Sequence, residues 1–123
     1  MNIIQYKPKN VSALEVRKFM IKIIQEDFGY GFNPKWHADI NDLSSTYYYN
    51  RNNVLFLAIY NREIIGTAGV REGSILSKKV PPEIRNRYPW ESTCRLVRVF
   101  VNPEFRRKGI AKALVNKCLE WIR

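Results

Sequence analysis

The first part of the chain shows hydrophobic positions at two different spacings. Residues 2–7 form a short apolar stretch, which predicts a β-strand. In residues 13–28 the apolar positions recur every three or four residues with charged residues between them, which is the period of an amphipathic helix. Ser12 and Glu15 have the S-x-x-E spacing of a capping box, and two glycines follow Phe28. We therefore expect this helix to begin after Ser12 and to end near Phe28.

Two continuous apolar runs lie in the middle of the chain, at 54–60 (VLFLAIY) and at 63–70 (EIIGTAGV). Between them stand Asn61 and Arg62, and asparagine tolerates the positive φ of a tight turn. The two runs are therefore expected to pair as an antiparallel hairpin. Because both runs are apolar at successive positions, we expect helices to cover both faces of the sheet.

The remaining segments predict one further strand and two further helices. A strand is expected at 92–101, after a loop at 73–91 that is rich in proline and cations. A helix is expected to begin close to Gly109, and its apolar face consists of Ile110, Leu114, Cys118 and Trp121 or Ile122. The segment 32–53 predicts a short helix, for which the candidate caps are Asp39, Asp42 and Ser44.

These elements give the order strand, helix, helix, strand, strand, strand, helix, or β-α-α-β-β-β-α. No linker and no internal repeat interrupts it. The order predicts one α/β (α+β) domain over residues 1–123. With 46% hydrophobic residues, the chain has enough apolar material for a core of its own.

Charge and hydropathy limit the classes of partner. The chain has 21 Lys and Arg against 11 Asp and Glu, a formal charge of +10 at pH 7, which favours an anionic partner. The cations are spread along the chain apart from a dense group at 106–112, so we do not expect a nucleic-acid-binding arm. The start of the chain lacks a signal-peptide pattern, and no apolar run approaches the roughly 18 residues that span a bilayer. We expect a cytoplasmic protein without a membrane segment.

The two cysteines, Cys94 and Cys118, have no ligand-like spacing. One falls in a predicted strand and the other in a predicted helix. We interpret them as free interior thiols rather than as a disulfide or a reactive pair, and we expect no metal site.

The segment 106–112 places several cations and Gly109 between the strand that ends at Asn102 and the helix that follows. The first amides of a helix have no partner within it, and the helix dipole adds positive charge there, so such an end binds anions. We interpret this segment, called the cradle below, as a site for a diphosphate, with Gly109 and Ala111 keeping bulk away. The alternative is that the glycine only eases the turn and the cations form a solvated surface. Neither G-x-x-x-x-G-K-[ST] nor G-x-G-x-x-G occurs in the chain.

The cradle and its neighbours also carry a resemblance to a known superfamily. Residues 106–111, RRKGIA, fit the R/Q-x-x-G-x-G/A signature of the GNAT-type N-acetyltransferases. The preceding VFVNPEF resembles the strand and turn that lead into that signature, and NVLFLAIYNREIIGTAGVRE resembles the family's second and third strands. The resemblance implies a GNAT-like mixed, largely antiparallel sheet flanked by helices, with acetyl-CoA as co-substrate and an amine as acceptor.

The resemblance further assigns roles to the last strand and to the cradle. The strand would offer backbone groups to the pantetheine arm of CoA at Val99, Phe100 and Val101. The backbone N–H of Val99 would stabilise the oxyanion that forms during acetyl transfer. The diphosphate would lie on the amides of Arg106, Arg107, Lys108, Gly109, Ile110, Ala111 and Lys112.

The sequence departs from the family pattern where a base is expected. Many members carry a glutamate early in the fourth strand, where this chain has Arg95. Glu91 is the nearest carboxylate and the candidate base, with a solvated loop charge as the simpler interpretation. His37 and Tyr48 are candidate substrate contacts, and packing over the sheet is the alternative for Tyr48.

The resemblance also implies a fifth strand, a further helix and closing strands beyond Arg123. We therefore expect a C-terminally incomplete domain, truncated after the third helix. Three explanations are open: a shortened chain, a natural fragment, or a partner that completes the sheet. An uncovered fourth strand presents an open edge, which predicts association with another copy of the chain.

The leading functional hypothesis is an N-acetyltransferase that moves an acetyl group from acetyl-CoA to a primary amine by direct attack. An incomplete chain can lack this activity on its own. The alternatives are a non-catalytic CoA-binding or regulatory module and, with less support, a basic nucleic-acid-binding protein. Thiol release from acetyl-CoA separates the first two, and an affinity that falls steeply with salt marks the third.

Overall fold

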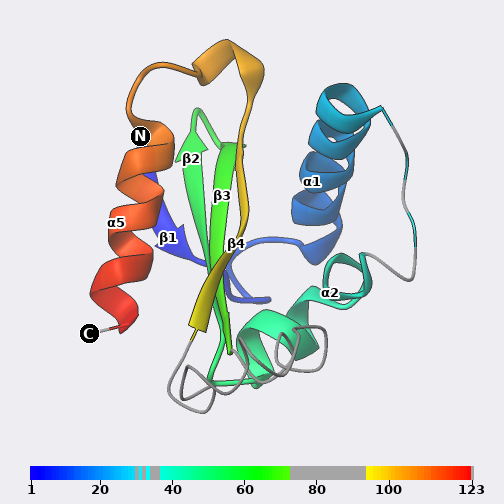
Figure 1. The fold of residues 1–123 in the computed structure, drawn as a ribbon, viewed down its shortest axis with the longest axis vertical. Coiled ribbons are helices and arrows are strands. Elements are labelled where there is room, and N and C mark those ends of the chain that lie inside the picture. The colour runs from blue at the N-terminus through cyan, green and yellow to red at the C-terminus, as the bar shows by residue number, and fades with distance from the viewer. Residues whose placement is uncertain (30, 32, 34–36, 73–93, 123) are drawn as a thin grey trace, which may run out of the picture.

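Four antiparallel strands form a single sheet in the computed structural model, which describes residues 1–29, 31, 33, 37–72 and 94–122 (Figure 1). The strands lie in chain order across the sheet. Their bounds are β1 Asn2–Gln5, β2 Val54–Tyr60, β3 Glu63–Glu72 and β4 Cys94–Val101. The expected loop at 73–91 lies outside the described residues.

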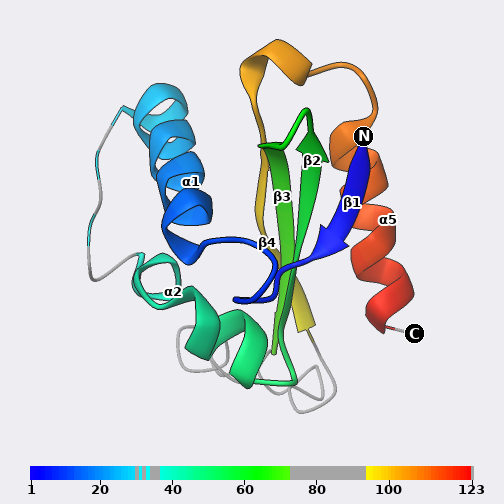
Figure 2. The same cartoon turned by 180° about the vertical axis from the view of Figure 1, so that it is seen from behind.

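Helices cover both faces of this sheet, as expected. On one face lie α1 (Ala13–Phe28), the short α2 (Ala38–Asn41) and a π-helical turn (Ser45–Tyr49). On the other face, α5 (Ile110–Ile122) packs against β2, β3 and β4 (Figures 1 and 2). The order β-α-α-β-β-β-α is thereby confirmed, with a π-helical turn and a 3₁₀ turn (Pro103–Phe105) added.

The two faces bury separate clusters of side chains. On the α5 face the cluster includes Val54, Phe56, Ala68, Leu114 and Cys118. On the α1 face it includes Val16, Met20, Leu55, Leu57 and Tyr47. Because β2 and β3 lie in the middle of the sheet, their side chains are buried on both faces, which explains their continuous apolar runs.

The β2–β3 turn and the end of α1 follow the sequence predictions. Asn61 and Arg62 have φ values of 50° and 66°, which suits a two-residue hairpin turn, and Tyr60 pairs with Glu63. Gly29 ends α1 in the left-handed conformation, with φ 76°, and its N–H donates to the Gln25 carbonyl.

Two local predictions about helices are wrong. Ser12 precedes α1, but its side chain makes no capping hydrogen bond within the described part of the chain. Its carbonyl oxygen instead accepts from the Glu15 and Val16 amides, so the backbone alone begins the helix. In α5, Ile110, Leu114 and Cys118 are buried as predicted, whereas Trp121 and Ile122 are 37% and 43% exposed.

Both cysteines are free, as predicted, and burial raises the pKa of the Cys118 thiol to about 11. None of the helices in the described part of the chain has both the length and the apolar character that crossing a bilayer requires.

Candidate functional site

A β-bulge interrupts β4 near its middle. Thr67 pairs with Phe100 and Gly69 pairs with Val97, so Ala68 of β3 faces two residues of β4, Arg98 and Val99. Arg98 takes a positive φ of 51°. A left-handed residue other than glycine costs about 1 to 3 kcal/mol and persists only where its surroundings hold it.

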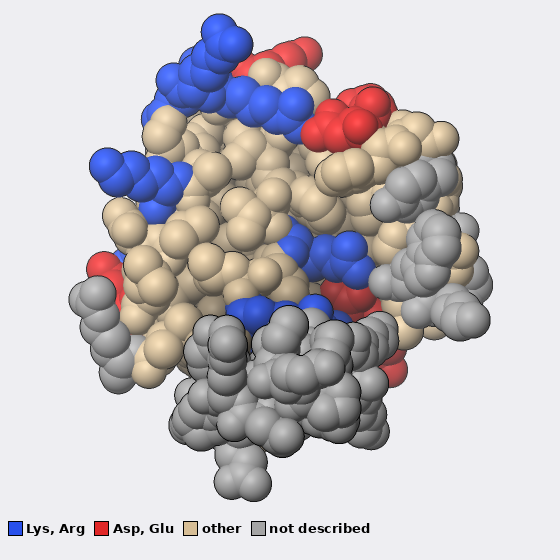
Figure 3. Space-filling model, in the orientation of Figure 1, with Lys and Arg blue, Asp and Glu red and all other residues tan. Residues whose placement is uncertain are grey.

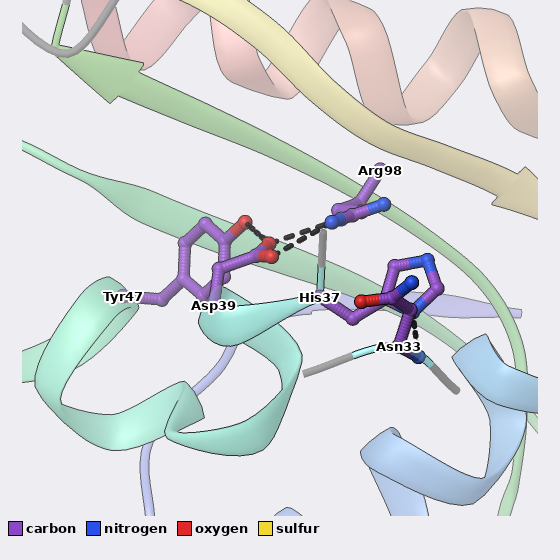
Figure 4. Close-up of polar contacts among 5 residues, drawn as sticks. All are labelled: Asn33, His37, Asp39, Tyr47 and Arg98. Atoms are coloured by element: carbon purple, nitrogen blue, oxygen red, sulfur yellow. Dashed lines mark hydrogen bonds and ion pairs between the residues drawn. The ribbon is translucent and has the colours of Figure 1, made fainter. Parts of the chain in front are cut away.

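Two sets of contacts hold Arg98 at the bulge. The Thr67 hydroxyl donates to the Arg98 carbonyl at 2.7 Å. The Arg98 guanidinium donates to both carboxylate oxygens of Asp39, from Nη2 to Oδ1 at 2.7 Å and from Nε to Oδ2 at 3.0 Å (Figure 4). The Tyr47 hydroxyl donates to Oδ2 of Asp39 at 2.6 Å. The bulge is therefore fixed from β3 and from the helical layer on the α1 face.

Asp39 corrects a sequence prediction, because it lies within α2 and does not cap it. Its side chain is only 3% exposed, and its partners are Arg98 and Tyr47. A buried carboxylate needs such partners, since an unpaired charge in the interior is strongly unfavourable. Of the other candidate caps, Asp42 accepts a hydrogen bond from the Ser45 amide at 3.3 Å.

The pKa values in this network follow from burial and charge. Burial alone would raise the pKa of Asp39, but hydrogen bonds from Arg98 and Tyr47 and the charges of Arg98 and Arg71 outweigh it, so the pKa is lowered. Burial favours the neutral form of Arg98, yet Asp39 raises its pKa above the usual value. Burial and the neighbouring Asp39 charge raise the pKa of the Tyr47 phenol. At neutral pH the network thus contains an ionised acid, an ionised arginine and a neutral phenol.

His37 lies directly before α2 and is 3% exposed. Its Nδ1 accepts a hydrogen bond from the Asn33 amide at 2.8 Å (Figure 4). A neutral histidine with an acceptor at Nδ1 carries its proton on Nε2. Burial and the charge of Arg98 lower the pKa of His37, against the opposing charge of Asp39. His37 is therefore a neutral Nε2–H donor near the network and is poorly suited to take a proton from a substrate.

The lowered pKa of His37 predicts a pH dependence of stability. A histidine whose folded pKa lies below its unfolded value of about 6.5 contributes stability that is complete above that pH and is lost as the pH falls. We expect the free energy of unfolding to decrease between pH 7 and pH 5. In His37→Asn, where the amide oxygen replaces Nδ1 as the acceptor, this decrease should be smaller. Urea titrations at several pH values measure both slopes, and equal slopes would contradict the prediction.

The cradle begins where β4 ends. Arg107 and Gly109 have φ values of 64° and 79°, so the chain turns through two left-handed residues before α5. The Ala113 amide donates to the Gly109 carbonyl at 3.0 Å, which is the first bond of the helix. The amides of the three residues between them have no partner within the helix, and cationic side chains gather over this turn (Figure 3). Such an end attracts an anion.

Gly109 is needed for its backbone conformation rather than for room. A Cβ built on it would meet nothing within 4 Å. The cationic side chains of the cradle are exposed, and among them Arg106 makes contacts with other elements. The Arg106 guanidinium contacts the Asp27 carboxylate and donates from Nε to the Val101 carbonyl at 3.0 Å. The Arg106 side chain is thereby already bound to α1 and β4, and the Arg106 amide donates to the Pro103 carbonyl at 3.4 Å.

The residues of β4 that were expected to hold the pantetheine arm lie on an edge strand. Val99 is 39% exposed, Phe100 packs against the cluster on the α1 face, and Val101 is buried on the α5 face. The expected substrate contact Tyr48 is half-buried in the π-helical turn, with its ring at 74° to that of Tyr49 and 5.0 Å away. The candidate base, Glu91, lies outside the described residues.

A cleft of about 690 Å³ opens on the α1 face, between α1 and the β2–β3 turn. Both signs of charge line it, with Lys18 and Glu15 from α1 and Arg62 from the turn. Asn102 and Pro103, which follow β4, close one end. Neither the bulge residues nor Gly109 line this cleft, so it is separate from the groups that could bind CoA.

The network of Thr67, Arg98, Asp39 and Tyr47 was not predicted from the sequence. Strict alternation along β4 places Arg95 and Arg98 on opposite faces, and only the bulge brings both to one face. The only related feature of the sequence is the spacing of these arginines, which a regular strand would place one on each face of a sheet whose two faces are covered.

Comparisons with known proteins agree with this architecture. The Acetyltransferase (GNAT) family profile matches residues 17–123. N-acetyltransferase 8 from Rattus norvegicus is 32% identical over 87 residues, which cover 71% of this chain and 34% of that protein. The chain thus spans about a third of the length of the curated relatives that it matches.

Solved structures show the same fold. An acetyltransferase of the GNAT family from Staphylococcus aureus Mu50 superimposes with a TM-score of 0.74 at 22% identity, over 98% of this chain and 65% of that one. An acetyltransferase from Clostridium acetobutylicum, solved with acetyl-CoA, gives a TM-score of 0.65 at 19% identity, over 97% and 71% of the two chains. The match of the family profile over 17–123, together with this architecture, shows that the chain belongs to the GNAT acetyltransferase family.

Proposed function

We propose that the protein transfers an acetyl group from acetyl-CoA to a primary amine by direct attack. The observation that carries the proposal is the sequence of groups along β4 and α5. A bulged edge strand leads directly into a helix start with unpaired amides and a surplus of cations. Acetyl-CoA has a thioester, an extended arm and a diphosphate in the same linear order.

In this proposal the diphosphate lies on the backbone amides of the cradle, with added charge from Arg107, Lys108 and Lys112. The pantetheine arm runs along the outer edge of β4 at Val99, Phe100 and Val101. The place of β4 at the edge of the described sheet supports this proposal, because no other described strand binds its outer backbone groups. The thioester then lies beside the bulge.

The chemistry requires a neutral amine, because an ammonium group has no lone pair with which to attack the thioester carbon. The attack forms a C–N bond and a tetrahedral oxyanion. As the oxyanion collapses, the C–S bond breaks and the proton lost by the nitrogen ends on the sulfur, which gives the amide and the CoA thiol. We assign the Val99 N–H as the donor that stabilises the oxyanion, a role whose loss typically lowers the rate by about 10² to 10³. Asp39 is unsuited to act as the base, since Arg98 and Tyr47 already bind its carboxylate.

Two measurements test the proposed function. Isothermal titration calorimetry with CoA tests the cradle, and thiol release from acetyl-CoA with a panel of primary amines tests the transfer. Binding with turnover supports the proposal. Binding without turnover for every amine supports a non-catalytic CoA-binding module instead, and failure to bind CoA overturns both.

The outer edge of β4 also supports the proposal that the chain pairs with a second copy. β4 is the last strand of the sheet within the described residues, and the apolar side chains of Leu96 and Val99 are 41% and 39% exposed on it. Unpaired strand edges recruit further strands. CoA would occupy the same edge, so the pairing is expected in its absence, where size-exclusion chromatography with light scattering should give twice the mass of the 14.5 kDa chain at high concentration. A constant monomer mass would contradict this proposal.

A further inference from the structure

Arg71 of β3 and Arg95 of β4 stand directly opposite each other in the sheet. Like charges in this arrangement repel and destabilise a strand pair. A Cβ on Gly69, two residues before Arg71, would lie 3.2 Å from the Tyr47 ring, and Val97, two residues after Arg95, packs on the same face. Because side chains two apart share a face, both arginines lie on the α1 face, together with the network of Asp39.

Within the described residues neither arginine has a hydrogen-bonded or ion-paired partner there, although the charge of Asp39 acts on both. Both side chains are partly buried, and the Nε atoms of both are buried without a hydrogen-bond partner within the described part of the chain. The neighbouring acid Glu72 accepts a hydrogen bond from the Asn52 side chain at 3.1 Å. Asp39 is the one buried carboxylate in the described part of this region, and it binds Arg98. In the described part of this region, three guanidinium groups therefore surround one buried carboxylate, and only that of Arg98 binds it.

This surplus of positive charge is unfavourable for the protein alone. Burial and the charge of Arg71 lower the pKa of Arg95, which shows that its charged form is disfavoured. Buried donors without a hydrogen-bond partner also destabilise the fold. A feature that weakens the fold in this way is typical of a site that a ligand completes. Figure 3 shows cationic groups exposed on this face beside acidic atoms, at the border of the residues drawn in grey.

We propose that Arg71 and Arg95 bind an oxyanion group of the acceptor, so that the acceptor is an amine that also carries a carboxylate or a phosphate. This inference rests on the proposed function, because it takes the bulge at Arg98 and Val99 as the place of acetyl transfer. Guanidinium groups bind carboxylate and phosphate through paired N–H donors, and the Nε–H is one of those donors.

The position of the two arginines along β4 favours the acceptor over CoA. The cradle follows the C-terminal end of β4, whereas Arg95 lies near the N-terminal end. Arg95 is four residues before Val99, about 13 Å along a strand, a distance that its long side chain and a small ligand can span together. CoA and the oxyanion of the acceptor would thus approach the bulge from opposite ends of the strand.

The test compares amines in pairs that differ only in the oxyanion group. The probes are phenylalanine with phenethylamine, glycine with methylamine, and phosphoethanolamine with ethanolamine. Binding is measured by calorimetry with CoA present, which occupies the cradle and keeps phosphate from binding there. We expect the anionic member of at least one pair to bind at least tenfold more tightly. A preference in the first two pairs indicates a carboxylate site, and a preference in the third pair indicates a phosphate site.

Arg71→Gln and Arg95→Gln should each remove most of that preference. The matched control is Arg62→Gln, an exposed arginine in the turn at the opposite end of β3, which should retain it. The melting temperature gives a second readout, because the removal of one of two repelling cations should leave it unchanged or raise it. A structural role for either arginine would lower it.

Three results would overturn the inference: no preference in any pair, an equal loss in the Arg62→Gln control, or a clear fall in melting temperature for both site variants. The preference for an anionic amine is measured as a difference in binding affinity, which does not require turnover. A protein that prefers anionic amines but releases no thiol therefore contradicts the proposed function alone, and a protein that releases thiol with all amines equally contradicts this inference alone.

Discussion

Asp39→Asn is expected to lower the free energy of unfolding by about 3 to 5 kcal/mol, which is the usual cost of leaving one member of a buried ion pair without its partner. The Asp39 and Arg98 side chains are only 3% and 20% exposed, so water cannot replace the lost carboxylate. Arg98 would then combine a positive φ with the loss of its two hydrogen bonds to a carboxylate. Urea denaturation measures the change.

A double-mutant cycle identifies the cause of this loss. Arg98→Met together with Asp39→Asn should cost less than the sum of the two single changes, because the double variant leaves no unpaired charge. The pH profile gives an independent readout. The folded pKa of Asp39 is lowered, so its contribution is present above the unfolded pKa of about 3.9 and is lost as the pH falls through the folded value. A cost below about 1 kcal/mol for Asp39→Asn would contradict a buried, mutually dependent pair.

Gly109→Asp is expected to weaken the binding of CoA by at least tenfold, about 1.4 kcal/mol. The new carboxylate would stand beside the unpaired amides at the start of α5, where it attracts the same N–H groups that a diphosphate needs. Aspartate is favoured at helix starts, and this preference offsets part of the strain at a φ of 79°. Stability should therefore change little while affinity falls. Calorimetry with CoA measures the affinity.

Gly29→Asp is the matched control for that experiment. Gly29 has a φ of 76°, and a Cβ on it would also meet nothing within 4 Å, so the backbone strain and the change in net charge are the same. It follows the C-terminal end of α1, where the helix dipole disfavours an anion. We expect this variant to lose stability and to keep its affinity for CoA. If the Gly109→Asp variant bound CoA as tightly as the unchanged protein, the cradle would not be part of the CoA site.

Features that depend on neighbours in sequence were predicted well. The β2–β3 turn follows from two residues that tolerate positive φ, and the start of α5 follows from Gly109 and the apolar period after it. The position of the cradle was accessible for the same reason, because its glycine and its cations are consecutive. Ser12 shows the limit of such signals: it has the spacing of a capping box, yet the backbone carbonyl alone begins the helix.

Features that depend on distant contacts were not accessible from the sequence. The contact between Arg98 and Asp39 joins residues 59 positions apart. It also needs the bulge in β4, which turns the Arg98 side chain to the α1 face of the sheet. Arg71 and Arg95 stand opposite each other because of the register in which β3 pairs with β4, and the segment that connects these strands lies outside the described residues. Trp121 was misplaced for a related reason, since a helical period states which side chains share a face but not how far the sheet extends beneath them.

The contact between Arg106 and Asp27 links the turn after β4 to the last helical turn of α1. A phosphate group that recruited the Arg106 side chain would have to compete with the carboxylate of Asp27 and would release that end of α1. CoA binding at the proposed site would then change how firmly α1 is held against the rest of the protein.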